Sequence, residues 1–122
     1  MFLNLSNHPS ANWSAEQKSA AETVGGAIVD LPFPIVDPAG DEDYISSLAD
    51  EYLCRILEMS DGEDVTVHLM GEMSLTFALV QRLCAHGIPC VAATTQRETV
   101  EYPDGRKESV FKFVQFRKYE QL

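Results

Sequence analysis

Apolar residues along the chain recur with two periods, and together these periods predict strands that alternate with helices. Short apolar runs indicate strands buried in a sheet, whereas apolar side chains three and four residues apart indicate helices. The predicted strands cover residues 1–5, 27–31, 65–70, 88–93, 98–102 and 109–116. Three predicted helices, which end near residues 24, 59 and 86, lie between the first four strands.

Capping residues and turn residues mark where these elements begin and end. Ser14 and Gln17 have the spacing of a capping box, so the first helix is expected to follow Ser14 and to stop at the two glycines after Val24. The longest helix is expected to begin after a cap at Asp41. Pro103–Arg106 predicts the turn of a hairpin between the last two strands.

This order of elements predicts a Rossmann-like α/β fold with a mainly parallel sheet and a C-terminal antiparallel β-hairpin. A chain of 122 residues is near the usual size of one domain, so residues 1–122 are expected to form a single domain. In such sheets, ligands bind beyond the carboxyl ends of the strands. That rule selects the segments after the first, third and fourth strands.

The net charge of −10 argues against duplex DNA or RNA as a partner, because such binding depends on neutralising phosphates. The charge is unevenly distributed: residues 97–122 carry a net charge of +1 and residues 1–96 a net charge of −11. A small anionic ligand could therefore bind near the C-terminal third. No apolar run approaches the length of a membrane span and the start lacks a basic leader, so we expect a cytoplasmic protein without membrane contact. The cysteines and histidines lack metal-ligand spacing, so we expect no metal, and His68 is expected to be a satisfied core or interface residue.

The segment after the first strand holds side chains suited to proton transfer. Asn7, His8 and Ser10 are the candidate catalytic residues, and His8 is the one among them that can exchange a proton near pH 7. Taken by themselves, Asn7 and Ser10 fit better as residues that build the turn and cap the helix, because loops are rich in such residues. Trp13, just beyond, either stacks on a nucleobase or covers the start of the first helix.

The segment after the third strand combines a glycine with a helix start. Gly71 at a strand end would bring the backbone N–H groups of Met73 and Ser74 to an anion or a ribose, and the hydroxyls of Ser74 and Thr76 add polar groups. Glu72 would repel a phosphate. It is therefore expected either to accept a hydrogen bond from a ribose or base edge, or to act only as a favourable charge at the helix N-terminus.

The segment after the fourth strand is predicted to be a polar loop that carries the best anion ligand of the chain. Arg97 is planar and always charged, and Thr94, Thr95 and Gln96 precede it as further candidate ligand-binding residues. The alternative is a surface ion pair of Arg97 with Glu98 or Glu72. We favour the ligand interpretation, because three polar loops would converge on one edge of the sheet.

Five segments carry a wider pattern: Leu3–Pro9, Met70–Met73, Thr94–Glu101, Asp104–Lys107 and Phe111–Tyr119. With these segments the chain resembles the small stand-alone CRISPR-associated proteins of the CARF-like ring nuclease type. The resemblance implies a homodimer that binds cyclic tetra-adenylate at its two-fold axis. It also implies metal-independent cleavage to linear di-adenylate, which ends type III CRISPR antiviral signalling, and it implies no cofactor.

Known relatives of that type differ in their catalytic side chains, so the resemblance assigns none here. Under this interpretation Arg97 would hold phosphate, and adenines would sit at Phe33 or Trp13. Two alternatives stay open from the sequence. One is a sensor or sequestering module that binds cyclic oligoadenylate without cutting it, and the other is an unrelated α/β interaction domain in which these loops are only turns.

Overall fold

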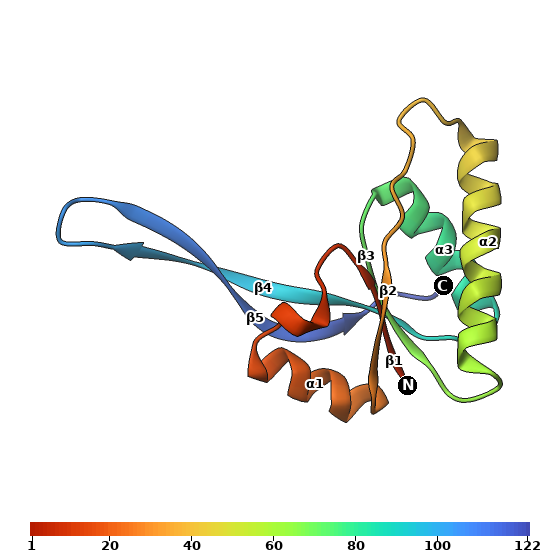
Figure 1. The fold of residues 1–122 in the computed structure, drawn as a ribbon, viewed down its shortest axis with the longest axis horizontal. Helices are drawn as coiled ribbons and strands as arrows, with labels where there is room; N and C mark the ends of the chain where they lie inside the picture. Colours follow the sequence, from red (N-terminus) through yellow and green to blue (C-terminus); the bar gives the residue numbers. More distant parts are fainter.

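Strands and helices alternate along the chain in the computed structural model, which describes residues 1–122 (Figure 1). The strands are β1 (Phe2–Ser6), β2 (Ile28–Pro32), β3 (Thr66–Met70), β4 (Cys90–Glu101) and β5 (Lys107–Lys118). The helices are α1 (Ala15–Gly25), α2 (Glu42–Ser60) and α3 (Met73–Ala85), and a 3-10 turn (Ser10–Asn12) precedes α1. None of the helices has the length and apolar content needed to cross a bilayer.

The five strands form one sheet in the order β2-β1-β3-β4-β5. The pairs β1–β2, β1–β3 and β3–β4 are parallel, and β4–β5 is antiparallel. This arrangement is Rossmann-like and confirms the predicted fold class, with the hairpin at the C-terminal end of the chain. The connection after β1 leads toward β2 and the connection after β3 leads toward β4. The crevice between these two diverging connections is where open α/β sheets bind ligands.

The two faces of the sheet are covered unequally. Leu3 and Leu5 of β1 and Leu69 of β3 belong to a core of 15 buried residues that includes residues of α2 and α3. The other face has a core of only 4 buried residues, which are Phe2, Trp13, Ala21 and Val91. Successive strand residues alternate between faces, so Asn4 and Ser6 share this face with Phe2. The face under α1 is therefore the polar one.

The predicted caps are confirmed. The Ser14 side chain accepts a hydrogen bond from the backbone of Gln17, and the Asp41 side chain accepts one from the backbone of Tyr44. α1 ends at Gly26, whose φ of 85° lies in the region that favours glycine.

The predicted loop at residues 94–97 is wrong, because β4 runs without a break from Cys90 to Glu101. The sequence suggested two short strands with a polar gap, but β5 pairs with β4 from Val91↔Lys118 to Glu101↔Lys107 and satisfies the backbone across that gap. The only irregularity is a register shift between Thr94 and Thr95. Polar side chains fit a strand here because residues 95–112 are exposed throughout.

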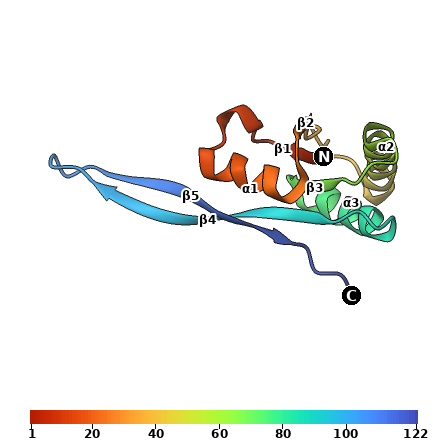
Figure 2. The ribbon, with the colours of Figure 1, turned by 90° about the horizontal axis from the view of Figure 1, so that it is seen from below.

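Most of β4 and β5 projects from the body as a two-stranded arm, defined here as residues 92–117 (Figures 1 and 2). β4 pairs with β3 only at Val67↔Cys90 and His68↔Val91. The ten residues of β4 after Val91 pair with β5 alone. At about 3.3 Å per residue, they extend roughly 30 Å beyond the last pair with β3.

The joint between β3 and α3 depends on a glycine. A Cβ atom added at Gly71 would lie 2.4 Å from the ring of Phe33, which is buried.

We therefore expect Gly71→Ala to lower the free energy of unfolding by about 1–3 kcal/mol, because a packed aromatic ring must move. Urea denaturation measures the change. In a Phe33→Leu background the same substitution should cost clearly less, and an equal cost in both backgrounds would contradict the steric explanation.

Candidate functional site

Asn4 joins three neighbouring strands on the polar face of the sheet. The register places it between Asp30 of β2 and His68 of β3. Its Nδ2 donates to Asp30 Oδ1 at 2.9 Å and to the carbonyl oxygen of His8 at 2.9 Å. Its Oδ1 accepts from the Ser6 hydroxyl at 2.8 Å and lies 2.9 Å from Nδ1 of His68. All four hydrogen-bonding positions of the amide are occupied.

This network fixes the tautomer of His68. The reversed amide would place Asn4 Oδ1 against a carbonyl and a carboxylate, which are both acceptors, so the orientation with Oδ1 toward His68 follows from the chemistry of its neighbours. Oδ1 needs a donor, so Nδ1 of His68 carries the proton. In a neutral imidazole, Nε2 then has a lone pair and no proton.

Burial keeps His68 neutral. Its side chain is 2% exposed and lies among the rings of Phe2, Trp13 and Phe116, with centroids 6.4, 5.5 and 5.4 Å away. Desolvation, with a smaller contribution from the nearby charge of His8, lowers the pKa of His68 to about 4. Nε2 is closed off from solvent and has no hydrogen-bond partner.

The loop after β1 is held in one shape by residues outside it. The carbonyl oxygen of His8 accepts from Asn4 Nδ2 and from Trp13 Nε1, the latter at 3.1 Å. The Ser10 hydroxyl donates to Asp30 Oδ2 at 2.9 Å. The backbone at His8 is therefore anchored on both sides, whereas the side chains of Asn7 and His8 are exposed.

These side chains face a hollow of about 860 Å³ between the loop, the start of α1 and the arm. The loop and α1 contribute Asn7, His8, Pro9, Asn12, Trp13, Ser14, Glu16 and Gln17. The sheet and the arm contribute His68, Met70, Ala93, Thr95, Glu98, Val110, Phe111, Lys112 and Phe113. We call this hollow the polar pocket. Its lining contains two carboxylates and a single lysine.

The joint after β3 is built differently from the prediction. The Glu72 carboxylate accepts from the backbone N–H of Ser74 at 3.0 Å and of Leu75 at 2.8 Å, and from the Ser74 hydroxyl. These hydrogen bonds, led by that of the hydroxyl, lower the pKa of Glu72. The N–H of Ser74 is therefore not free to hold a phosphate, and Glu72 is the N-cap of α3.

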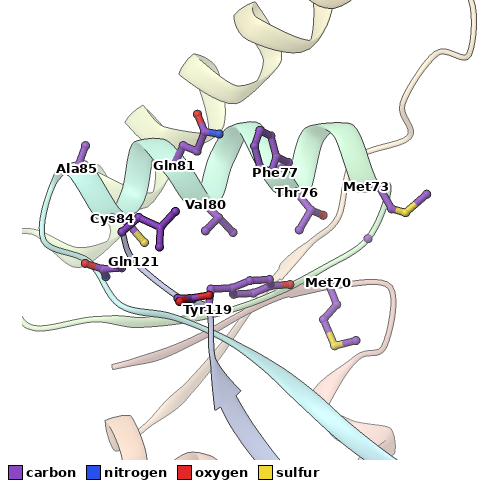
Figure 3. A pocket seen from close by; sticks show the side chains of 13 residues that line it. Met70, Met73, Thr76, Phe77, Val80, Gln81, Cys84, Ala85, Tyr119 and Gln121 are labelled. Atoms are coloured by element: carbon purple, nitrogen blue, oxygen red, sulfur yellow. The ribbon is translucent and has the colours of Figure 1, made fainter.

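Gly71, Met73 and Thr76 line a second, apolar hollow of about 820 Å³ beside α3 (Figure 3). Figure 3 shows Thr76, Val80 and Cys84 directed from α3 toward the ring of Tyr119. The Tyr119 hydroxyl already donates to the carbonyl of Leu69 at 2.7 Å. Only Met70 lines both hollows. The structure thus separates the predicted site into two parts, and the predicted catalytic residues Asn7 and His8 line the polar pocket.

The remaining predicted ligand residues lie in places that the sequence did not anticipate. Phe33 is buried against Gly71, and Trp13 is 8% exposed, which matches its alternative role as a cover. Thr94 fills the register shift by bonding to the backbone of Gln115, and Thr95 lines the polar pocket. Gln96 is exposed on the arm.

Arg97 also lies on the arm and donates from Nε and Nη2 to the Ser109 hydroxyl, at 3.1 and 2.9 Å. No ion pair of Arg97 with a glutamate is present. His68 is the residue that sequence reasoning missed, because an isolated histidine in an apolar strand is usually a satisfied core residue. The signal was the short polar pattern Asn4–Ser6 in a strand that is otherwise apolar.

Comparison with known proteins gives one match. The family model described as "Uncharacterized protein MJ1673 family" matches residues 1–117. No curated protein and no solved structure matches the chain.

Protonation of His68 should couple folding to pH. The folded protein binds this proton with a pKa of about 4, against 6.5 for the ordinary side chain. Between these values the unfolded chain carries a proton that the folded chain lacks, so the free energy of unfolding falls as the pH falls from 7 toward 4. The loss amounts to about 3 kcal/mol.

The variant His68→Asn, which keeps a donor near the Nδ1 position, should lack this loss. Urea denaturation at pH 7, 5.5 and 4.5 measures the free energy of unfolding of both proteins. The difference between wild type and variant should shrink as the pH falls. His86→Asn, a change at an exposed histidine, is the matched control and should follow the wild type. A stability difference that stays constant with pH would contradict the assignment.

Proposed function

The chain belongs to the MJ1673 family, and we propose that it is a ring nuclease that binds cyclic tetra-adenylate in a homodimer cleft and cleaves it to linear di-adenylate. In this proposal cleavage ends type III CRISPR signalling. The observation that carries the proposal is the polar pocket, where an anchored loop presents the exposed side chains of Asn7 and His8 at the crevice between β1 and β3.

The chemistry of ring cleavage suits these groups. A ribose 2′-hydroxyl can attack the adjacent phosphorus when it is held in line, provided that a group removes its proton and another stabilises the leaving oxygen. In this proposal His8 exchanges protons, and Asn7 donates or accepts hydrogen bonds at the reacting groups; both residues line the polar pocket. The anchored backbone supports this role, because a fixed position is what in-line attack requires.

Adenine recognition falls to the arm rather than to the aromatic residues suggested by the sequence. Trp13 and Phe33 are buried, so neither offers an open face. Phe111 is 66% exposed and lines the polar pocket together with Phe113. An exposed aromatic ring provides a stacking surface for a base.

One protomer lacks the positive charge that a ligand with four phosphates needs. The polar pocket has Lys112 as its only lysine or arginine, against Glu16 and Glu98. The arm carries five basic and four acidic residues, whereas the rest of the chain carries four basic and fifteen acidic residues. We propose that the arm, with Arg97, reaches a second copy and lies against its acidic body. A two-fold dimer then brings two arms to one ligand, so that each protomer contacts half of the ring.

Exposed apolar side chains on the arm also support a second copy of the chain as its partner. Val110, Phe111 and Val114 are 42%, 66% and 55% exposed. An isolated two-stranded ribbon is marginally stable in water, and a second surface against these side chains would stabilise it. This explains why apolar residues persist on a segment that makes few contacts with its own body.

The direct test is incubation with cyclic tri-, tetra- and hexa-adenylate in the presence of EDTA, followed by chromatography. We expect cyclic tetra-adenylate to give linear di-adenylate. His8→Ala should lower the single-turnover rate by roughly 10²–10⁴-fold with nearly unchanged affinity, as expected when a proton-transferring group is removed. His86→Ala is the matched control and should leave the rate unchanged.

Other outcomes have defined meanings. Tight binding of a ring that stays intact would identify a sensor rather than a nuclease. Full activity in His8→Ala, with activity lost in Asn7→Ala, would mean that the loop acts by positioning alone. Ser10→Ala reports on the anchor to Asp30 and should act through loop order rather than through chemistry. Absence of binding to all three rings would contradict the proposal.

The dimer can be tested apart from cleavage. We expect sedimentation at micromolar concentration to give twice the mass of 13.6 kDa. Val114→Asp should raise the monomer fraction, because it places a charge on an exposed apolar position of the arm that does not line the polar pocket. Val24→Asp introduces the same charge at a site that is 50% exposed on α1 and should leave the mass unchanged. A wild type that stays monomeric with and without ligand would contradict the proposed dimer.

A further inference from the structure

His68 holds a hydrogen-bond acceptor that nothing in the protein satisfies. Nδ1 is committed to Asn4, Nε2 has no partner, and the residue lines the polar pocket. A buried acceptor left unpaired costs stability, so folded proteins rarely retain one without a use. The surrounding rings of Phe2, Trp13 and Phe116 offer no donor aimed at this nitrogen.

The chemistry of Nε2 restricts which group of a ligand can form a hydrogen bond with it. A lone pair on a neutral ring takes a hydrogen bond from a donor, so a phosphate oxygen, which is itself an acceptor, does not fit. An adenylate offers two kinds of donor, the ribose 2′-hydroxyl and the exocyclic amine of the base. Nε2 is shielded from solvent in the ligand-free protein, so a donor reaches it only when a neighbouring side chain of the pocket moves aside. A small group that projects on its own requires the least movement. A hydroxyl meets that requirement, whereas the amine lies on the edge of a large planar ring.

We propose that Nε2 of His68 accepts a hydrogen bond from a ribose 2′-hydroxyl of the bound cyclic adenylate and thereby orients that hydroxyl for attack. The inference rests on the proposed function and adds a substrate contact to it. Orientation is the role, rather than proton uptake, because desolvation makes this imidazole a weak base. Proton transfer is then left to His8, whose side chain is exposed at the same pocket.

Asn4 and Asp30 complete the arrangement as positioning residues. Asp30 accepts from Asn4, and Asn4 accepts from His68, so the ring plane is set by a row of residues across three strands. The proton is held on Nδ1, and the lone pair is thereby kept on the nitrogen that faces away from Asn4. This fixed tautomer is what makes the residue selective for a donor.

The experiment uses two rings that cannot be cleaved, because a methylene group replaces each 5′ oxygen. One ring keeps the 2′-hydroxyls and the other carries 2′-fluorine, which cannot donate. In the wild type, loss of the hydroxyl should weaken binding about tenfold, the usual size of one hydrogen bond. In His68→Asn, which keeps a donor toward Asn4 but lacks the acceptor at the ε position, the two rings should differ by less than about twofold.

Two further measurements separate the possible outcomes. His68→Gln, which can place an oxygen near the ε position, should recover part of the discrimination. Nitrogen NMR of the ligand-free protein should find the His68 proton on Nδ1, and a proton on Nε2 would overturn the proposal without any ligand. A third uncleavable ring, which keeps the 2′-hydroxyls but lacks the exocyclic amines, tests the other donor. Coupling of His68 to the amine instead of the hydroxyl would also overturn it.

Failure of the inference and failure of the proposed function give different results. Binding of both rings with equal discrimination in wild type and His68→Asn would remove only the role of His68. Binding of neither ring by the wild type would remove the ring nuclease proposal and this inference together. Cooperative thermal unfolding of His68→Asn at pH 7, with a midpoint above the temperature of the binding assay, confirms that the comparison concerns folded protein.

Discussion

The geometry of the polar face depends on one fully bonded amide. Asn4 lies at the centre of a row in which Asp30, Asn4 and His68 are neighbours on three adjacent strands. Its four hydrogen bonds link the second strand, the third strand and the loop that follows the first. A buried amide with every position satisfied is selective, because any shift in strand register would leave several groups unpaired at once. The same residue that secures the register therefore also positions the loop.

The body and the arm contribute different groups to the polar pocket. The body provides a rigid loop and a buried, neutral imidazole, while it contributes a strong excess of negative charge. The arm provides exposed aromatic side chains and most of the positive charge, yet it touches little of its own body. Under the proposed function, precise placement and attraction of an anion would come from different parts of one small chain. The proposed site, assembled from two copies, would reconcile an acidic protein with an anionic ligand.

Local patterns were enough to predict most of the fold. The caps at Ser14 and Asp41 and the turn at Pro103–Arg106 act within a few residues, so the sequence shows them directly. The continuous strand β4 was missed because its polar middle is satisfied by β5, a partner that no local pattern reveals.

The candidate site was predicted less completely, for the same reason. His8 and Asn7 were predicted because they follow a strand end, whereas the tautomer of His68 depends on Asn4, which lies 64 residues away in the chain. Glu72 was left between two roles, and only the hydrogen bonds to Ser74 and Leu75 decide between them. Which buried groups remain unpaired depends on tertiary structure, so the sequence alone could not show that Nε2 of His68 lacks a partner.

The arm has one more consequence, which concerns aggregation. Beyond the body, β4 and β5 each expose an unpaired edge, and a free edge is a template on which further strands can add. Charged residues of both signs recur along these edges, among them Glu98, Glu101, Lys107, Glu108 and Lys112. Such side chains make edge-to-edge stacking unfavourable, because each added strand would have to bury or oppose them. In the proposed dimer, an arm of this composition would contact the partner through its faces, so that association would end at a closed pair instead of growing into a fibre.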